Sequence, residues 1–314
     1  MQNLVFSLNV VAPVFLIIIL GVVLKSTKQI NENFISISSK IVFNVSMPAL
    51  VFVELSTADF DASFNVKLLA FINVGTFVFF ILAWILALVI SKDGRDQGSF
   101  IQGSVRSNFV IVGFAIIFNM FGNSGLSKAA IMMAFIMPLY NVLAIVALTV
   151  PLHKEKQVGF KKTIWEISTN PLLLAAVLAI PFSLYKIVLP LVLSKSIEYL
   201  AAMTLPLALI GIGGSLNFES IKKDSRLAVI ATAIKIVLIP LVLTSLAIKF
   251  GFRGENLGAM FILFATPTAI ASFVMAKAMD CNAELAGNII LLSTLGSVIT
   301  ISSGIFILKS MGYF

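Results

Sequence analysis

The sequence contains very few of the residues that bind metals or carry out redox chemistry. Its 314 residues include one cysteine, Cys281, and one histidine, His153. A single cysteine excludes a disulfide within the chain, and neither residue belongs to a cluster with metal-ligand spacing. We therefore expect no metal and no other cofactor.

Charged residues are scarce as well. Only 11% of the residues are charged, 59% are hydrophobic, and the mean hydropathy is +1.07, whereas about 25% of the residues are charged in an ordinary soluble domain. The net charge of +8 comes from basic residues in short segments between apolar runs, so no nucleic-acid partner is expected. The composition predicts an all-α polytopic membrane protein surrounded by the lipid bilayer.

Ten apolar segments are long enough to cross a bilayer as helices. In the first half of the chain they are Leu4–Leu24, Ile35–Leu55, Val66–Ile90, Phe100–Phe121 and Leu126–Val150. In the second half they are Pro171–Val188, Ser194–Leu216, Leu227–Phe250, Leu257–Ala276 and Glu284–Leu308.

The two sets of five spans indicate an internal repeat. One offset of 158 residues places Pro13 on Pro171, Pro48 on Pro206 and Phe109 on Pro267. Two halves with an odd number of spans run in opposite directions, which is the inverted repeat of many secondary transporters. We expect a first repeat at 1–150, a cytoplasmic loop at 151–169 and a second repeat at 170–314. Chance agreement is the alternative, because prolines gather near helix starts in any protein.

The distribution of basic residues predicts the orientation. Fourteen Lys and Arg residues, Arg106 among them, follow odd-numbered spans, and seven lie on the other side. Cytoplasmic loops carry the excess of Lys and Arg. We therefore expect both termini outside, in a plasma membrane such as the bacterial inner membrane.

The fourth and ninth spans are polar near their middles. Arg106, Ser107 and Asn108 precede Gly113 in the fourth span, and Pro267 lies among Thr266, Thr268 and Ser272 in the ninth. Such segments occur at membrane depth only where protein or a water-filled cavity surrounds them. We expect two broken helices that meet near the bilayer centre and direct their positive N-terminal ends at an anion.

These residues carry a resemblance to a known family. The chain contains Arg106-x-Asn108 with Gly113 five residues later, Asn44-x-Ser46-x-Pro48, Tyr140-Asn141, and Pro267 followed by Ala271-Ser272-Phe273. In this order and spacing the motifs resemble the auxin efflux carrier family, which includes bacterial permeases for malate, malonate and related acids. The resemblance covers essentially all ten spans.

The resemblance implies a fold and a mechanism. The fold is the crossover fold of the bile acid sodium symporters, an NhaA-like arrangement in which spans 4 and 9 are broken. Spans 1, 2, 6 and 7 would form a scaffold, and spans 3–5 and 8–10 a transport domain that moves like an elevator. Asn108 would meet the substrate carboxylate, while Ala115 and Ser272 occupy places where plant members have proline.

Other polar residues have two interpretations. Asn44 and Ser46 face the substrate or join helices, and Tyr140 and Asn141 complete the pocket or bind freed carbonyls. Lys235 lies inside the eighth span, where it compensates the charge of an anion or extends to the cytoplasmic surface. A run of small residues at 211–214 is better explained by close helix packing than by phosphate binding.

We therefore predict a transporter of small organic anions such as malate or malonate, not an enzyme. Every Asp lies in a loop or at a span end and Glu54 ends the second span, so no intramembrane carboxylate is expected to carry a coupling ion. A sodium-coupled symporter of bile-acid-like anions is the alternative among carriers, and a channel or a membrane-embedded enzyme are the alternatives outside them. A homodimer is left open.

Overall fold

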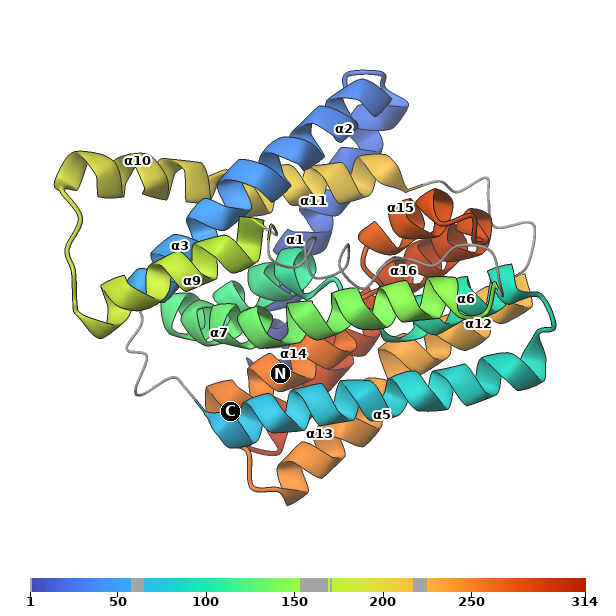
Figure 1. Ribbon diagram of the computed structural model, residues 1–314. Helices are drawn as coiled ribbons and strands as arrows, with labels where there is room; N and C mark the ends of the chain where they lie inside the picture. Colours follow the sequence, from blue (N-terminus) through green and yellow to red (C-terminus); the bar gives the residue numbers. More distant parts are fainter. Residues whose placement is uncertain (1, 58–64, 153–168, 170, 217–224) are drawn as a thin grey trace.

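The protein is helical throughout the part of the chain that its computed structural model describes, which is residues 2–57, 65–152, 169, 171–216 and 225–314 (Figure 1). One isolated antiparallel bridge is the only strand-like pairing within these residues. The predicted all-α class is thus confirmed. Apart from residues 151, 152 and 169, the predicted loop at 151–169 lies outside the described residues.

Three long helical stretches open the chain. They are α1 (Gln2–Ser26), then α2 (Glu32–Ile41) continued by the π-helix η1 (Val42–Ser46) and by α3 (Met47–Thr57), and α5 (Val66–Ile90). The second and third stretches begin at asparagines. Asn31 and Asn65 each accept a hydrogen bond from the backbone N–H three residues later, which satisfies a donor that the first helical turn leaves free.

The second half contains comparable stretches. They are α9 (Pro171–Leu184), α10 (Leu191–Ala202) followed by α11 (Thr204–Ser215), and α12 (Ser225–Ala233) continued by the π-helix η4 (Ile234–Leu238) and by α13 (Ile239–Lys249). Figure 1 shows α10 and α11 running past α2 and α3, and contacts join α10 to α3 and α11 to α2.

The remaining helices form two interrupted segments and a long final helix. They are α6 (Gly94–Val105), η2 (Phe109–Gly113) with α7 (Phe114–Thr149), α14 (Gly254–Ala265), α15 (Ala271–Ala278) and α16 (Ala283–Ser310). Within α7 the backbone turns sharply at Gly122, whose φ of 62° and ψ of −150° are accessible to glycine. This turn separates the expected fourth span from the expected fifth.

Seven of the described helical stretches are long and apolar enough to span a membrane, so the chain is a multi-pass membrane protein. They are Val5–Ser26, Glu32–Thr57, Val66–Ile90, Phe109–Thr149, Leu191–Ser215, Arg226–Lys249 and Ala283–Ser310. The stretch at 109–149 counts once although it contains Gly122, while α9 and the two pieces α14 and α15 are too short to count. The number of ten spans stays a prediction.

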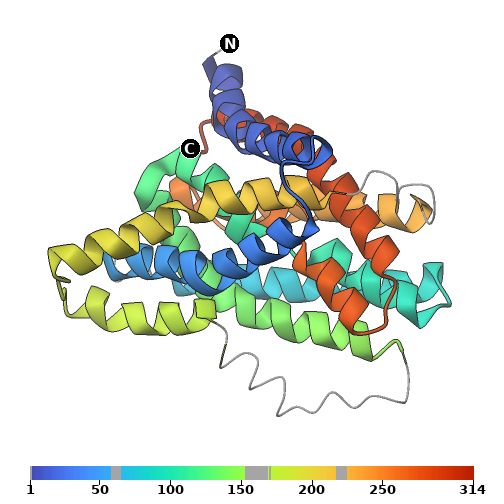
Figure 2. The same ribbon diagram turned by 90° about the horizontal axis from the view of Figure 1, so that it is seen from above.

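The helices form two groups by their contacts. α1, α2, α3, α9, α10 and α11 pack mainly on one another, and so do α5, α6, α7 and α12 to α16. The groups meet where α1 contacts α16 and α7, where α3 and α9 contact α7, and where α11 contacts η2. Figure 2 shows the start of α1 beside the end of α16, where the Asn3 side chain donates to the Ser310 hydroxyl at 3.1 Å.

Close packing within the first group depends on glycine. A Cβ atom on Gly213 of α11 would lie 1.9 Å from the Ile18 carbonyl oxygen of α1, and one on Gly21 would lie 2.3 Å from that of Ile210. The two helices therefore touch backbone to backbone, as small residues permit in membranes. The expectation of close packing at 211–214 is confirmed for Gly213.

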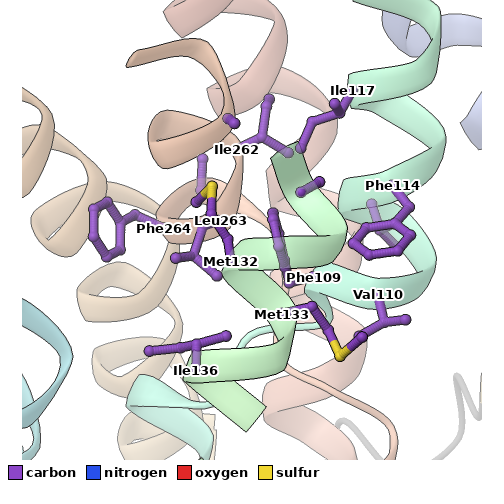
Figure 3. Packing of buried hydrophobic residues seen from close by; sticks show 14 of the residues in the cluster. Phe109, Val110, Phe114, Ile117, Met132, Met133, Ile136, Ile262, Leu263 and Phe264 are labelled. Atoms are coloured by element: carbon purple, nitrogen blue, oxygen red, sulfur yellow. The ribbon is translucent and has the colours of Figure 1, made fainter. Parts of the chain in front are cut away.

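A dense apolar core fills the second group. Phe109 and Phe114 stack edge to face at 5.5 Å between ring centres. Figure 3 shows them beside Met132 and Met133 of α7, with Leu263 and Phe264 of α14 close by. The polar residues that interrupt the helices thus lie against a well-packed core, which fixes their positions.

Candidate functional site

The first interruption lies between α6 and η2 and consists of three polar residues. Arg106 ends α6 with extended backbone at φ −69° and ψ 117°, and Asn108 starts η2 at φ −83° and ψ 49°. All three side chains from 106 to 108 are buried. Neither glycine nor proline causes the break here, so it must be maintained by contacts with other parts of the chain.

The second interruption lies between α14 and α15. Thr266 ends α14 with extended backbone at φ −61° and ψ 148°, and α15 begins at Ala271. Pro267 contributes directly, because proline has no N–H and disfavours helical backbone in the preceding residue. Thr266, Thr268 and Ser272 are fully buried.

The two interruptions pair with each other through backbone hydrogen bonds. The Asn108 N–H donates to the Pro267 carbonyl at 2.8 Å, and the Ala269 N–H donates to the Arg106 carbonyl at 3.2 Å. Ser107 and Thr268 lie opposite each other in this short antiparallel bridge. We call residues 106–108 and 266–270 the crossing.

Hydroxyl groups complete the crossing in a reciprocal pattern. The Ser107 hydroxyl donates to the Leu263 carbonyl of α14 at 2.7 Å, and the Thr268 hydroxyl donates to the Gly103 carbonyl of α6 at 2.6 Å. Ser107 is also hydrogen-bonded to Thr266. Each interruption therefore satisfies a carbonyl that the end of the other half's helix leaves free.

Arg106 places a cation in the crossing. Its side chain is 8% exposed, and its guanidinium donates to the Met275 sulfur at 2.8 Å and to the Asn141 side-chain oxygen at 3.1 Å. Among the described residues no carboxylate forms an ion pair with it. A thioether is a weak acceptor, so the guanidinium is only partly satisfied.

A very small cavity borders Arg106. Its volume is about 10 Å³, and Gln102, Arg106 and Tyr140 are among its lining residues. The buried Gln102 side-chain oxygen has no partner within the described chain. The space suffices for one water molecule and not for an organic acid.

Asn108 carries the other free polar group of the crossing. Its side chain is 7% exposed and makes no hydrogen bond to the described residues. The Ser272 hydroxyl, at the start of α15, is likewise buried without a partner in this part of the protein. Both groups lie where a helix begins, and helix N-termini attract negative charge.

Lys235 of η4 lies next to the crossing, at the end of α14. Its side chain is 1% exposed, and its ammonium donates to the Phe264 carbonyl in the last turn of α14 at 2.8 Å. The side chain therefore points inward and does not extend to a membrane surface. A cation at this position is favourable, because the C-terminal end of a helix carries partial negative charge.

The remaining predicted site residues lie at various distances from the crossing. Tyr140 is buried beside Thr76, Ser107 and Arg106, so it belongs to the site with Asn141. Gly113 and Ala115 have helical backbone after the interruption. In η1, by contrast, Asn44 is exposed and Ser46 is buried with its hydroxyl unpaired within the described residues.

A larger cavity of about 450 Å³ separates the two helix groups. Its walls come from α1, α3, α10 and α11 on one side and from α7 on the other, and Ala115 lies in the α7 wall. The polar side chains among its lining residues are Glu54, Asn119 and Glu198. It therefore has room for a small organic acid but offers it no positive charge.

Some site residues were missed from the sequence. Arg106 belongs to the polar segment identified in the fourth span, but its count among the basic residues of cytoplasmic loops gives it no role in binding, whereas the structure places it directly after α6, in the crossing. Met275 gave no signal, because its role depends on contacts with Arg106 and Gln102, which lie 169 and 173 residues earlier in the chain. The signal that could have found Arg106 is its place two residues before Asn108.

Comparisons with known proteins point to transport. A family model described as a membrane transport protein matches residues 6–303. An uncharacterized transporter of Methanothermobacter thermautotrophicus is 23% identical over 299 residues, which cover 94% of this chain and 96% of the relative. The uncharacterized transporter MJ1031 of Methanocaldococcus jannaschii is 23% identical over 306 residues, with coverage of 94% and 96%. The uncharacterized transporter YfdV of Escherichia coli K12 is 22% identical over 313 residues, with coverage of 97% and 98%.

Proposed function

Because this chain belongs to the membrane transport protein family, that of the auxin efflux carriers, we propose that it is a secondary transporter of small organic anions. Malate and malonate represent the class of substrate. The family and the relatives are transporters rather than enzymes, so the proposal concerns the substrate and the mechanism.

The observation that carries the proposal is the buried guanidinium of Arg106 without a carboxylate partner in the described chain. A buried cation is costly unless an anion or several hydrogen bonds compensate it. The free carboxamide of Asn108 and the start of η2 are part of the same crossing. A carboxylate is the ligand that these groups favour together, since guanidinium binds carboxylates through paired hydrogen bonds.

The position of the cavities supports a moving site. The space at Arg106 holds one water molecule, whereas the cavity of about 450 Å³ lies between the two helix groups. We propose that a substrate enters through the larger cavity and is bound when the crossing shifts relative to α1, α3, α10 and α11. The two groups of helices would be the scaffold and the transport domain of an elevator mechanism.

The helix bounds support an inverted repeat of five spans. α6 and α14 each have 12 residues, begin at 94 and 254 and end at 105 and 265, which is a constant offset of 160. α5 covers 66–90, and α12 to α13 covers 225–249, an offset of 159. With the turn at Gly122, this pattern is what a crossover fold of ten spans requires. The proposed repeats remain 1–150 and 170–314.

The proposed location is a plasma membrane with both termini outside. The hydrogen bond between Asn3 and Ser310 joins the start of α1 to the end of α16. This agrees with an even number of membrane spans, which would place both termini on the same side. A homodimer also stays a prediction, and cross-linking in membranes would test it.

Transport in proteoliposomes tests the proposed function. Labelled malate and malonate should exchange in counterflow with the same unlabelled acid, and Asn108→Ala should reduce this flux at least tenfold while the protein still inserts and folds. Asn73→Ala is the matched control, because among the described residues the Asn73 side chain hydrogen-bonds the Leu69 carbonyl of its own helix and no other group. Flux of Asn108→Ala equal to that of the control would remove Asn108 from the site.

The same assay separates the alternatives. Strict dependence on sodium would favour a sodium-coupled symporter, and flux that does not saturate would favour a channel. If the wild-type protein exchanges neither these acids nor other carboxylates, the proposed substrate class is wrong.

A further inference from the structure

Lys235 is a buried titratable group that lies outside the proposed anion site formed by Arg106 and Asn108. It is among the largest fully buried side chains described, and within the described residues its ammonium makes one hydrogen bond, to the Phe264 carbonyl at 2.8 Å. Phe264 lies two residues before Thr266, where α14 ends. The ammonium thus caps one of the four helix ends at the crossing.

No charged side chain of the neighbouring described helices compensates Lys235. The elements packed against η4 are α12, α13, α14, α16 and α6. Their charged residues are Arg226, Lys249, Glu255, Glu284, Lys309, Arg95 and Asp96. None of these forms an ion pair or a hydrogen bond with Lys235. Glu255 is instead paired with Lys128 at 2.6 Å.

The two halves differ at this position. With the offset of 159 that relates α5 to α12 and α13, the residue equivalent to Lys235 is Thr76. Thr76 is also buried and lies next to Tyr140. The first half therefore has a neutral hydroxyl where the second half has an amine. Because α6 is interrupted without a lysine at the equivalent position, a cation is not required for such an interruption to form.

The energetics connect a proton on Lys235 with an anion in the crossing. Burial of an isolated ammonium costs several kcal/mol, and a single carbonyl at a helix end offsets only part of this. A carboxylate bound at the crossing adds a compensating negative charge. Each ligand therefore strengthens the binding of the other, and this coupling is reciprocal.

We propose that Lys235 is the proton-binding site that couples anion transport to the proton gradient. Its neutral amine takes a proton from water on the side where the anion enters and becomes an ammonium, and it returns the proton to water when the anion leaves. Because Lys235 and the crossing belong to the same helix group, the proton and the anion travel together. The inference rests on the proposed function and adds the coupling ion.

Accumulation driven by a pH gradient tests the coupling. Wild-type protein in proteoliposomes, with the membrane potential clamped at zero, should accumulate labelled malonate up to about tenfold per unit of inward proton gradient for one coupled proton. Lys235→Met should lose this dependence of malonate accumulation on the proton gradient, because a neutral side chain of similar length binds no proton. Lys309→Met is the control, since Lys309 lies in the last turn of α16, where its half-buried side chain contacts the Phe6 ring of α1 and not the crossing.

A second measurement on the unmodified protein guards against a variant that fails to fold. Calorimetric titration of detergent-purified wild-type protein with malonate, in buffers of different ionisation enthalpy, should show proton uptake on binding. Malonate transport without proton uptake, or accumulation by Lys235→Met equal to that of wild type, refutes this inference and leaves the proposed function intact. Failure of wild type to move any carboxylate refutes both.

Discussion

Replacing Arg106 by methionine should weaken carboxylate binding and at the same time stabilise the empty protein. A hydrogen bond to a charged group contributes about 1.5–3 kcal/mol, so loss of the guanidinium should raise the Kd for malonate about 10- to 150-fold. The side chain is 8% exposed and its present partners are one amide oxygen and one thioether. An unpaired buried charge is thus removed without breaking an ion pair.

The stability effect has the opposite sign to the binding effect. Replacing buried charged groups by well-packed apolar side chains is neutral or stabilising by about 1–4 kcal/mol. The hydrogen bond to Asn141, of about 0.5–1.5 kcal/mol, offsets part of the gain. The unfolding midpoint of Arg106→Met without malonate should therefore be equal to or above that of wild type, and malonate should raise it less.

Isothermal titration and thermal unfolding of the purified protein measure both effects. Arg253→Met is the control, because the Arg253 guanidinium lies 5.0 Å from the Tyr313 ring centre and donates to the Ile248 and Phe252 carbonyls, away from the crossing. A Kd within twofold of wild type, together with a lower unfolding midpoint, would show that Arg106 stabilises the fold and does not bind the anion.

Two further predictions concern packing and reactivity. Gly213→Val should lower the unfolding midpoint by the equivalent of about 1–3 kcal/mol, because its Cβ would lie 1.9 Å from the Ile18 carbonyl oxygen. Gly287→Ala is the control and should have little effect, since the nearest contact of its Cβ is at 3.6 Å. Equal midpoints in thermal unfolding would contradict the close approach of α1 and α11. Burial raises the pKa of the Cys281 thiol to about 11, so its thiolate fraction at pH 7 is on the order of 10⁻⁴. Labelling by a maleimide should be slow at pH 7, rise about tenfold per pH unit and become fast in sodium dodecyl sulfate; equally fast labelling of the folded protein would show that the thiol is open to solvent.

The places where helices break could be read from the sequence. Polar residues at 106–108 and proline among threonines at 266–268 are costly in lipid, and the structure interrupts both helices there. The turn at Gly122 was anticipated only as a gap between two apolar runs. These features depend on local composition, which sequence patterns report well.

The charges at the crossing could not be placed in the same way. Lysine in a span can extend to the surface or point inward, and the choice for Lys235 depends on the free carbonyl of Phe264, 29 residues away. Arg106 was misjudged because hydropathy does not show that the polar helix α6 is buried from Gln97 to Val105. Both outcomes follow from long-range packing, which no local pattern contains.

The pairing of the two interruptions also has a consequence for biosynthesis. The Ser107 hydroxyl donates to the carbonyl of Leu263, 156 residues later in the chain. The Gly103 carbonyl accepts from the hydroxyl of Thr268, 165 residues later. At about 5–20 residues per second, the ribosome needs roughly 8–30 s to supply those partners. During that time the first broken helix has unpaired polar groups that lipid cannot satisfy. Its membrane insertion therefore ends only after the second half has arrived, and nascent chains that stop before residue 268 should leave this segment accessible to water.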